Sequence, residues 1–314
     1  MIFRMAVCVL VLLGLPLIAS EKDPFILDLE FKRAVEKRGT EFKFTKVFLN
    51  GLKTERFKGS YKAYNSVDES LISHEFVYYR PKGLKNKKIP LIIIVPPVLG
   101  ITPFDYMAAS YLSSKGLGVA VLKLNVPTTD LKVEVESIGR EWEAYVEKVR
   151  AFIDMAGELP SVDKRKIGIM GLSLGGITAT LSMGRDPRLK AAVIFMGSGN
   201  LPHILAYSVQ AVVRKLRKEK MKKFKIGEAW DFETFLKEKI KIKTPYLTEG
   251  RGPGDYYLFI TKKDSYIPGR SQMKLRDKLG LPKTTFLKNG HVLNGILYPV
   301  HLKKIKDYFL SKFH

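Results

Sequence analysis

Cysteine occurs only once in the 314 residues, at Cys8. A single cysteine cannot form an internal disulfide, and it provides no thiolate cluster for a metal. The sequence also contains no HExxH pair, no GxGxxG fingerprint and no GKS or GKT loop. We therefore expect neither a metal nor a nucleotide cofactor. With 46% hydrophobic residues, the chain is expected to be globular and to be stabilised by a packed core.

Acidic residues are few relative to basic ones: 31 Asp and Glu stand against 54 Lys and Arg, which gives a formal net charge of +23. Such an excess favours anionic partners, including membrane surfaces, cell-wall polymers and nucleic acids. The lysines are scattered, however, and zinc-finger spacing, aromatic ribonucleoprotein motifs and an isolated basic arm are all missing. We therefore expect no nucleic-acid binding. A solvated, lysine-rich surface is the simpler explanation of the charge.

Residues 1–20, MIFRMAVCVLVLLGLPLIAS, have the pattern of a secretory signal peptide. Arg4 precedes an apolar run at residues 6–19, and small residues stand before the first charges that follow. This run is shorter than the roughly 20 residues that span a bilayer as a helix, and Gly14 and Pro16 interrupt it. The pattern favours cleavage and export to the periplasm or the medium, with anchoring by this segment as the alternative.

The remainder, residues 21–314, alternates between strand and helix patterns. Strands separated by helices indicate right-handed crossovers and a mostly parallel sheet with helices on both faces, the α/β class. Residues 201–250 break this rhythm, and we expect them to form an inserted helical cap. The predicted strands are 70–81, 89–97, 117–125, 165–173, 189–200, 254–264 and 282–291, and the predicted helices are 103–116, 137–156 and 298–313.

The stretch GLSLG, from Gly171 to Gly175, matches G-x-S-x-G and follows a predicted strand. That motif builds a sharp strand-to-helix turn, which exposes the serine hydroxyl above the end of the sheet. Ser173 is therefore a candidate nucleophile. The alternative is an inactive serine in a glycine-rich turn.

A serine nucleophile needs a general base and a carboxylate that orients it. Asp264 follows one predicted strand in FITKKDSYIP, and His291 ends the next in LKNGH. The carboxyl ends of parallel strands lie at one edge of the sheet, so both side chains are expected near Ser173. Each could instead be a solvated loop residue. Of the other histidines, His74 is expected in an edge strand and His203 at the start of the cap.

From about residue 70 onward, the chain resembles the α/β-hydrolases. The resemblance is carried by PLIIIVPPVLG, GLSLGG, TKKDSYIP and NGH. It implies that Ser173 is the nucleophile, His291 the base and Asp264 the orienting acid. The chemistry implied is cleavage of a small-molecule or lipid ester through an acyl-enzyme. An amidase, peptidase or thioesterase with the same triad, or an inactive binding protein with this fold, is the alternative.

One loop departs from the pattern of many α/β-hydrolases, which carry a His-Gly element after the strand at 89–97. Here the loop runs Pro96-Pro97-Val98-Leu99-Gly100, similar to dienelactone-hydrolase-like and peptidase-like members. An oxyanion hole needs two backbone N–H groups, and proline has none. We predict that Leu174 supplies one N–H group and Val98 the other.

The predicted cap contains RKLRKEKMKKFK at residues 214–225, with eight basic residues and one acidic residue. An apolar stripe precedes and enters this segment at Leu205, Val209, Val212 and Leu216. Such a helix could lie on an anionic membrane surface or attract anionic substrates. It could equally pack by its stripe, with its lysines in water. For the substrate pocket we predict Leu99, His203 and Trp230. The oligomeric state is not indicated.

Overall fold

The computed structural model describes residues 45–47, 54–65, 70–84, 87–124, 133–157, 161–240 and 251–313. The predicted signal peptide at residues 1–20 lies outside the described residues, as does the end of the predicted cap at 241–250. Cleavage and export therefore stay predictions. None of the helices in the described ranges is long and apolar enough to cross a membrane.

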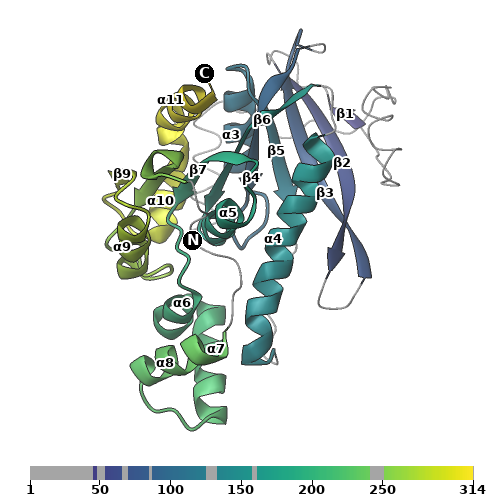
Figure 1. Ribbon diagram of the computed structural model, residues 1–314. Helices are drawn as coiled ribbons and strands as arrows, with labels where there is room; N and C mark the ends of the chain where they lie inside the picture. The colour runs from purple at the N-terminus through teal and green to yellow at the C-terminus, as the bar shows by residue number, and fades with distance from the viewer. Residues whose placement is uncertain are drawn as a thin grey trace.

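The described residues form one nine-stranded sheet in the order β1-β2-β3-β5-β4-β6-β7-β8-β9. Pairs β1–β2, β2–β3 and β3–β5 are antiparallel, and all the other neighbours are parallel. The predicted α/β class with a mostly parallel sheet is confirmed (Figure 1). The strands are β1 (Thr45–Val47), β2 (Thr54–Asn65), β3 (Ser70–Pro81), β4 (Ile89–Val95), β5 (Gly118–Lys123), β6 (Val162–Leu172), β7 (Leu189–Phe195), β8 (Tyr256–Ile260) and β9 (Lys283–Phe286).

Several strand predictions need correction. The strands predicted at 189–200 and 254–264 end earlier, at Phe195 and Ile260. β3 is not an edge strand, because β2 pairs along its whole length and places His74 opposite Tyr61. β2 itself was missed, although Phe57, Tyr61 and Ala63 alternate with polar residues and are buried as period-2 patterning requires. The last strand ends at Phe286 and not at residue 291, because the chain turns there into a loop before the next helix.

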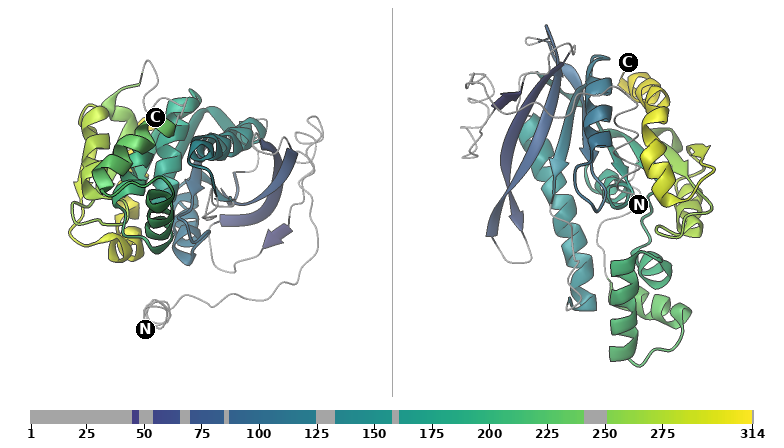
Figure 2. Two further views of the ribbon diagram at one scale, coloured as in Figure 1. Left: turned by 90° about the horizontal axis from the view of Figure 1, so that it is seen from below. Right: turned by 180° about the vertical axis from the view of Figure 1, so that it is seen from behind.

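Helices cover both faces of the sheet, as the two further views show (Figure 2). One face packs against α4 (Val135–Gly157), α5 (Leu174–Arg185) and α9 (Gly269–Lys278). The other packs against α3 (Pro103–Ser113) and α11 (Leu302–Phe313). The central strands are apolar on both faces: every side chain from Leu91 to Val95 is at most 1% exposed. This burial explains the continuous apolar runs in the sequence.

Between β7 and β8, the chain forms α6 (Leu201–Tyr207), α7 (Ala211–Lys223) and α8 (Ala229–Lys239). Figure 1 shows these helices as a lobe at one end of the molecule, beside the lower end of α4. A separate apolar cluster joins Phe232 and Leu236 of α8 to Trp142 of α4. Two ion pairs, Lys223 with Glu134 at 3.0 Å and Lys239 with Glu136 at 3.2 Å, tie the lobe to the start of α4.

Candidate active site

Ser173 occupies the turn between β6 and α5, at the carboxyl end of the sheet. Its backbone has φ 59° and ψ −116°, in the left-handed half of the map that non-glycine residues rarely adopt. The Ser173 N–H group donates to the carbonyl oxygen of Phe195 at 2.9 Å, which holds the turn against the end of β7. Although Ser173 occupies the N-cap position of α5, its hydroxyl makes no helix-capping hydrogen bond.

The motif glycines are required by close backbone contacts. A Cβ atom on Gly171 would collide with the carbonyl oxygen of Gly175, and one on Gly175 would collide with that of Val95. The second contact also presses the end of β4, together with Pro96, against the first turn of α5. These contacts hold the Ser173 turn and the loop after β4 side by side.

His291 is the first residue of α10 (His291–Leu297), and its Nε2 lies 2.9 Å from Ser173 Oγ. The preceding loop is held by its Asn289 carbonyl, which accepts hydrogen bonds from the Thr261 hydroxyl and the Asn294 amide. The ring of Tyr266 stacks on the imidazole, with 5.2 Å between ring centroids and an interplanar angle of 28°. The backbone before His291 is thus held by hydrogen bonds, and one face of the imidazole is covered by Tyr266.

Asp264 lies in the loop after β8 and is 5% exposed. Its Oδ2 is 2.6 Å from His291 Nδ1 and accepts a second hydrogen bond from Gln272 Nε2 at 2.8 Å. Its Oδ1 accepts the backbone N–H groups of Tyr266 and Ile267 at 2.8 and 3.0 Å. Four donors therefore surround a carboxylate that is almost entirely removed from water.

The carboxylate of Asp264 determines which nitrogen of His291 carries the proton. A carboxylate can only accept, so His291 Nδ1 carries the proton that it donates to Asp264. His291 Nε2 then presents its lone pair to the Ser173 hydroxyl, which donates to it. The three residues predicted as catalytic thus meet in one hydrogen-bonded chain, although they are up to 118 positions apart in the sequence.

Gln272 of α9 was missed by sequence reasoning. It is 1% exposed, and its side chain also accepts from the Thr261 backbone N–H at 3.2 Å and donates to the Ile267 carbonyl at 2.7 Å. No motif marks this position. The available signal was weak: a glutamine that begins the second turn of the helix directly after the Asp264 loop.

Of the two predicted oxyanion donors, Leu174 directly follows Ser173, and Val98 belongs to the loop after β4, whose Pro96 packs against Gly175 of α5. Leu174 is the first residue of α5, so its N–H has no acceptor within the helix. Val98 lies in the turn after β4, where Gly100 N–H donates to the Pro97 carbonyl at 3.0 Å. Within the described ranges neither the Leu174 nor the Val98 N–H donates to a protein acceptor. Their role as oxyanion donors stays a prediction.

The predicted pocket residues are dispersed. Leu99 is 86% exposed in the turn after β4, and Trp230 is 63% exposed on α8. His203 is buried in α6 beside Tyr207, and this burial lowers its pKa, against the opposing effect of Glu233. In the described structure, neither His203 nor Trp230 makes a hydrogen bond or ring contact with the three catalytic candidates. Their role in a pocket stays a prediction.

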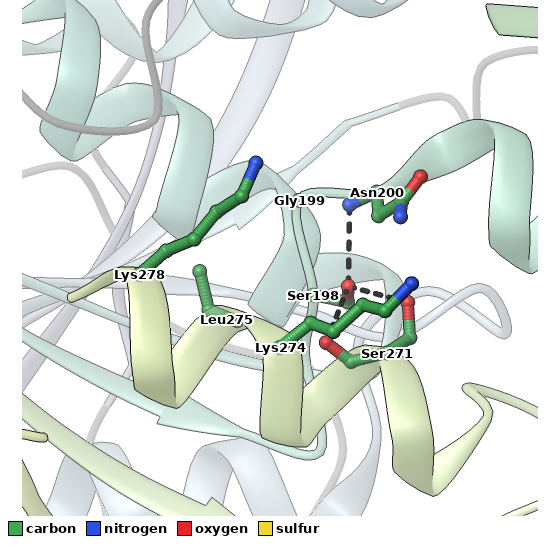
Figure 3. A pocket seen from close by; sticks show the side chains of 7 residues that line it. All are labelled: Ser198, Gly199, Asn200, Ser271, Lys274, Leu275 and Lys278. Atoms are coloured by element: carbon green, nitrogen blue, oxygen red, sulfur yellow. Dashed lines mark hydrogen bonds between the residues drawn. The ribbon is translucent and has the colours of Figure 1, made fainter.

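A small cavity lies between the start of α6 and α9, with a volume of about 30 Å³ (Figure 3). Ser198 Oγ lies 2.9 Å from Ser271 Oγ and accepts a hydrogen bond from the Asn200 N–H at 3.2 Å. These polar groups of the cavity wall therefore already have partners within the protein. This volume suits a water molecule and not an acyl chain. None of the catalytic candidates lines it. The lining residues are Ser198, Gly199, Asn200, Ser271, Lys274, Leu275 and Lys278.

Comparisons with known proteins agree with this architecture. A model of the dienelactone hydrolase family matches residues 76–241, which is more than half of the chain. No curated protein matches the sequence. Among solved structures, an acetyl xylan esterase from a Paenibacillus species aligns with a TM-score of 0.62 at 14% identity, over 95% of this chain and 96% of that one.

Two further structures are similar. Acetyl xylan esterase 1 from a Thermoanaerobacterium species has a TM-score of 0.61 and 13% identity, over 90% of this chain and 95% of that one. A putative dienelactone hydrolase from Klebsiella pneumoniae has a TM-score of 0.51 and 14% identity, over 81% of this chain and 98% of that one. At these identities the likeness shows the shared fold.

Proposed function

This chain belongs to the dienelactone hydrolase family, and on that premise we propose that it cleaves carboxylic esters through an acyl-enzyme intermediate formed on Ser173. The observation that carries the proposal is the unbroken chain of hydrogen bonds. Ser173 Oγ is 2.9 Å from His291 Nε2, and His291 Nδ1 is 2.6 Å from Asp264 Oδ2. This arrangement lets a neutral serine hydroxyl act as a nucleophile near neutral pH.

In the first half of the reaction, Ser173 Oγ attacks the ester carbonyl carbon while its proton passes to His291 Nε2. The resulting imidazolium then gives this proton to the departing alkoxide oxygen, and the acyl group remains on Ser173. In the second half, a water molecule gives a proton to His291 Nε2 and attacks the acyl carbon. The carboxylic acid leaves, and the proton returns to Ser173 Oγ.

Asp264 stabilises the imidazolium of each step and holds the ring in the required tautomer. Because Gln272, Tyr266 and Ile267 also donate to this carboxylate, it cannot rotate away from His291 without breaking several hydrogen bonds. Its role is to hold His291 in position and to stabilise the positive charge that forms on the imidazole.

The negative charge that develops on the ester carbonyl oxygen needs donors that are already in place. Leu174 N–H at the start of α5 has the helix dipole behind it, which favours an anion there. Val98 N–H is assigned as the second donor because Pro96 and Pro97 have none, and because the loop after β4 is pressed against α5 at Gly175.

The bond cleaved is proposed to be an ester and not an amide or thioester. Because enzymes that cleave esters, amides and thioesters share this triad chemistry, the triad does not identify the bond. The choice of an ester is supported by the names of similar structures. The two most similar structures reported above are named as acetyl xylan esterases. An inactive binding protein is disfavoured by the complete hydrogen-bonded chain at Ser173.

Turnover of p-nitrophenyl esters from acetate to palmitate tests the proposal. The full chain is compared with Ser173→Ala and with Ser311→Ala, which alters an exposed serine on α11. We expect hydrolysis by the native chain and by Ser311→Ala, and loss of turnover in Ser173→Ala with an almost unchanged melting temperature. Hydrolysis that survives in Ser173→Ala would refute the nucleophile assignment.

A further inference from the structure

Helix α7 presents a cationic face to solvent. Arg214, Lys215, Lys218 and Lys222 recur at spacings of three and four residues and are all exposed, whereas Leu216 is buried on the opposite side. Among the described residues none of these four cations forms an ion pair; Lys223, by contrast, pairs with Glu134. The helix has one acidic residue, Glu219. This face therefore carries positive charge that the described protein does not neutralise.

The start of α7 is apolar and exposed. Val209 is 45% exposed and Val212 is 37% exposed, although both are aliphatic. The Val209 N–H donates to the carbonyl oxygen of Ser265 at 2.9 Å, directly beside Asp264 in sequence. The apolar end of the helix is thus attached to the catalytic loop, and the cationic residues continue from it along α7.

Two other exposed side chains with apolar surface adjoin His291: Tyr266 stacks on its ring, and Val292 follows it in α10. A third, Leu99, is exposed in the turn after β4. These residues come from three separate loops or helices at the carboxyl end of the sheet. Scattered single apolar residues are normal on a protein surface, but apolar residues grouped around one functional site indicate an interaction surface.

We infer that the α7 patch, defined as Val209, Val212, Arg214, Lys215, Lys218 and Lys222, docks on an anionic lipid surface. The inference rests on the proposed function, and it names the substrate class: esters presented at that surface. Lysine and arginine are attracted to anionic headgroups, and aliphatic side chains insert at the headgroup and acyl boundary. A soluble anionic polymer would satisfy the cations and leave Val209 and Val212 in water, so a lipid surface fits the patch better.

Binding to vesicles tests the cationic half of the α7 patch. The full chain is sedimented with vesicles of phosphatidylcholine alone and with an equal mixture of phosphatidylcholine and phosphatidylglycerol. The test variant is Lys215→Glu/Lys218→Glu/Lys222→Glu. The matched control is Lys82→Glu/Lys87→Glu/Lys88→Glu, which makes the same charge change at three exposed lysines between β3 and β4, at the amino end of β4.

We expect the native chain to prefer the anionic vesicles, with weaker binding at high salt. In the α7 triple variant, the preference for anionic over neutral vesicles should fall by roughly 100-fold. In the control variant it should fall by less than about ten-fold. All variants contain residues 1–20, so any contribution of that segment is the same in each. Equal losses in the two triple variants would overturn the inference, because binding would then follow net charge alone.

A second pair of variants tests the apolar half. Val212→Ser should weaken vesicle binding several-fold, whereas Leu281→Ser, at an exposed apolar residue before β9, should not. Binding to soluble polygalacturonate is measured in parallel. Retention of vesicle binding in Val212→Ser, or binding to the polymer with none to vesicles, would contradict a lipid-facing patch.

Activity separates this inference from the proposed function. None of the substituted residues belongs to the catalytic chain, so turnover of soluble p-nitrophenyl acetate should stay within about two-fold in every variant. Hydrolysis of a long-chain ester dispersed in the anionic vesicles should fall in the α7 variants through a higher apparent KM. Loss of all turnover in the native chain would refute the proposed function, whereas soluble turnover without vesicle binding would refute only the inference.

Discussion

Replacing Asp264 by asparagine keeps the shape of the side chain, but one of its two accepting oxygens becomes an NH₂ group that donates. If the new amide nitrogen took the Oδ1 position, it would face the N–H groups of Tyr266 and Ile267, now bonded at 2.8 and 3.0 Å. If it took the Oδ2 position, it would face one protein donor, the Gln272 amide at 2.8 Å, and would donate to His291 Nδ1. The second orientation leaves fewer donors unpaired and should prevail.

That orientation forces His291 into the wrong tautomer. A ring whose Nδ1 accepts must carry its proton on Nε2, which lies 2.9 Å from Ser173 Oγ and can then no longer take the hydroxyl proton. A tautomer reversal of this kind costs about 10⁴-fold in kcat. The unpaired Gln272 donor should lower the free energy of unfolding by about 1–3 kcal/mol.

Steady-state hydrolysis of p-nitrophenyl acetate and thermal unfolding measure the two effects separately. The matched control is Asp277→Asn, which makes the same chemical change at an exposed carboxylate on α9. We expect Asp264→Asn to lose kcat by about 10³- to 10⁴-fold while remaining folded at 25 °C. A kcat within about ten-fold of the native value in folded Asp264→Asn would refute the tautomer argument.

Three further outcomes are expected. Gly175→Ala should yield no folded protein in soluble expression because its Cβ would collide with a carbonyl oxygen of β4, whereas Gly227→Ala, with open space around it, should fold normally. Gln272→Met should lower kcat about ten-fold with little change in KM, because Asp264 loses one of its fixed donors; an unchanged kcat would deny Gln272 a positioning role. Burial lowers the pKa of His74 to about 4. Between pH 6.5 and 4, His74 is therefore protonated in the unfolded chain and neutral in the folded chain. The melting temperature should therefore fall between pH 6.5 and 4, and His74→Phe should reduce this fall; an identical pH dependence in the variant would contradict the assignment.

Much of the fold could be predicted from the sequence because its parallel strands are buried on both faces. Such strands are continuous apolar runs, as at Ile89–Val95, and they are easily separated from helices. Strand β2 was harder because one of its faces carries lysines, so only alternate residues such as Phe57 and Tyr61 mark it. Strand ends were least certain: His291 was expected in a strand and begins α10.

For the candidate site, the sequence could predict that Ser173, Asp264 and His291 come together, because each follows a strand and strand ends of a parallel sheet converge. Gln272 and Tyr266 could not, because their roles depend on how a helix and a loop pack around Asp264. The predicted pocket residue Trp230 was chosen for its size, and it lies exposed on α8.

The central claim is that Ser173 is an activated nucleophile, and the most direct test is covalent. The full chain is incubated with a fluorophosphonate, and the labelled peptide is identified by mass spectrometry, with Asp264→Asn treated in parallel. We predict one phosphonyl group on Ser173 and much slower labelling in the variant. Absence of labelling, labelling at another residue, or equal rates in the two proteins would contradict the account.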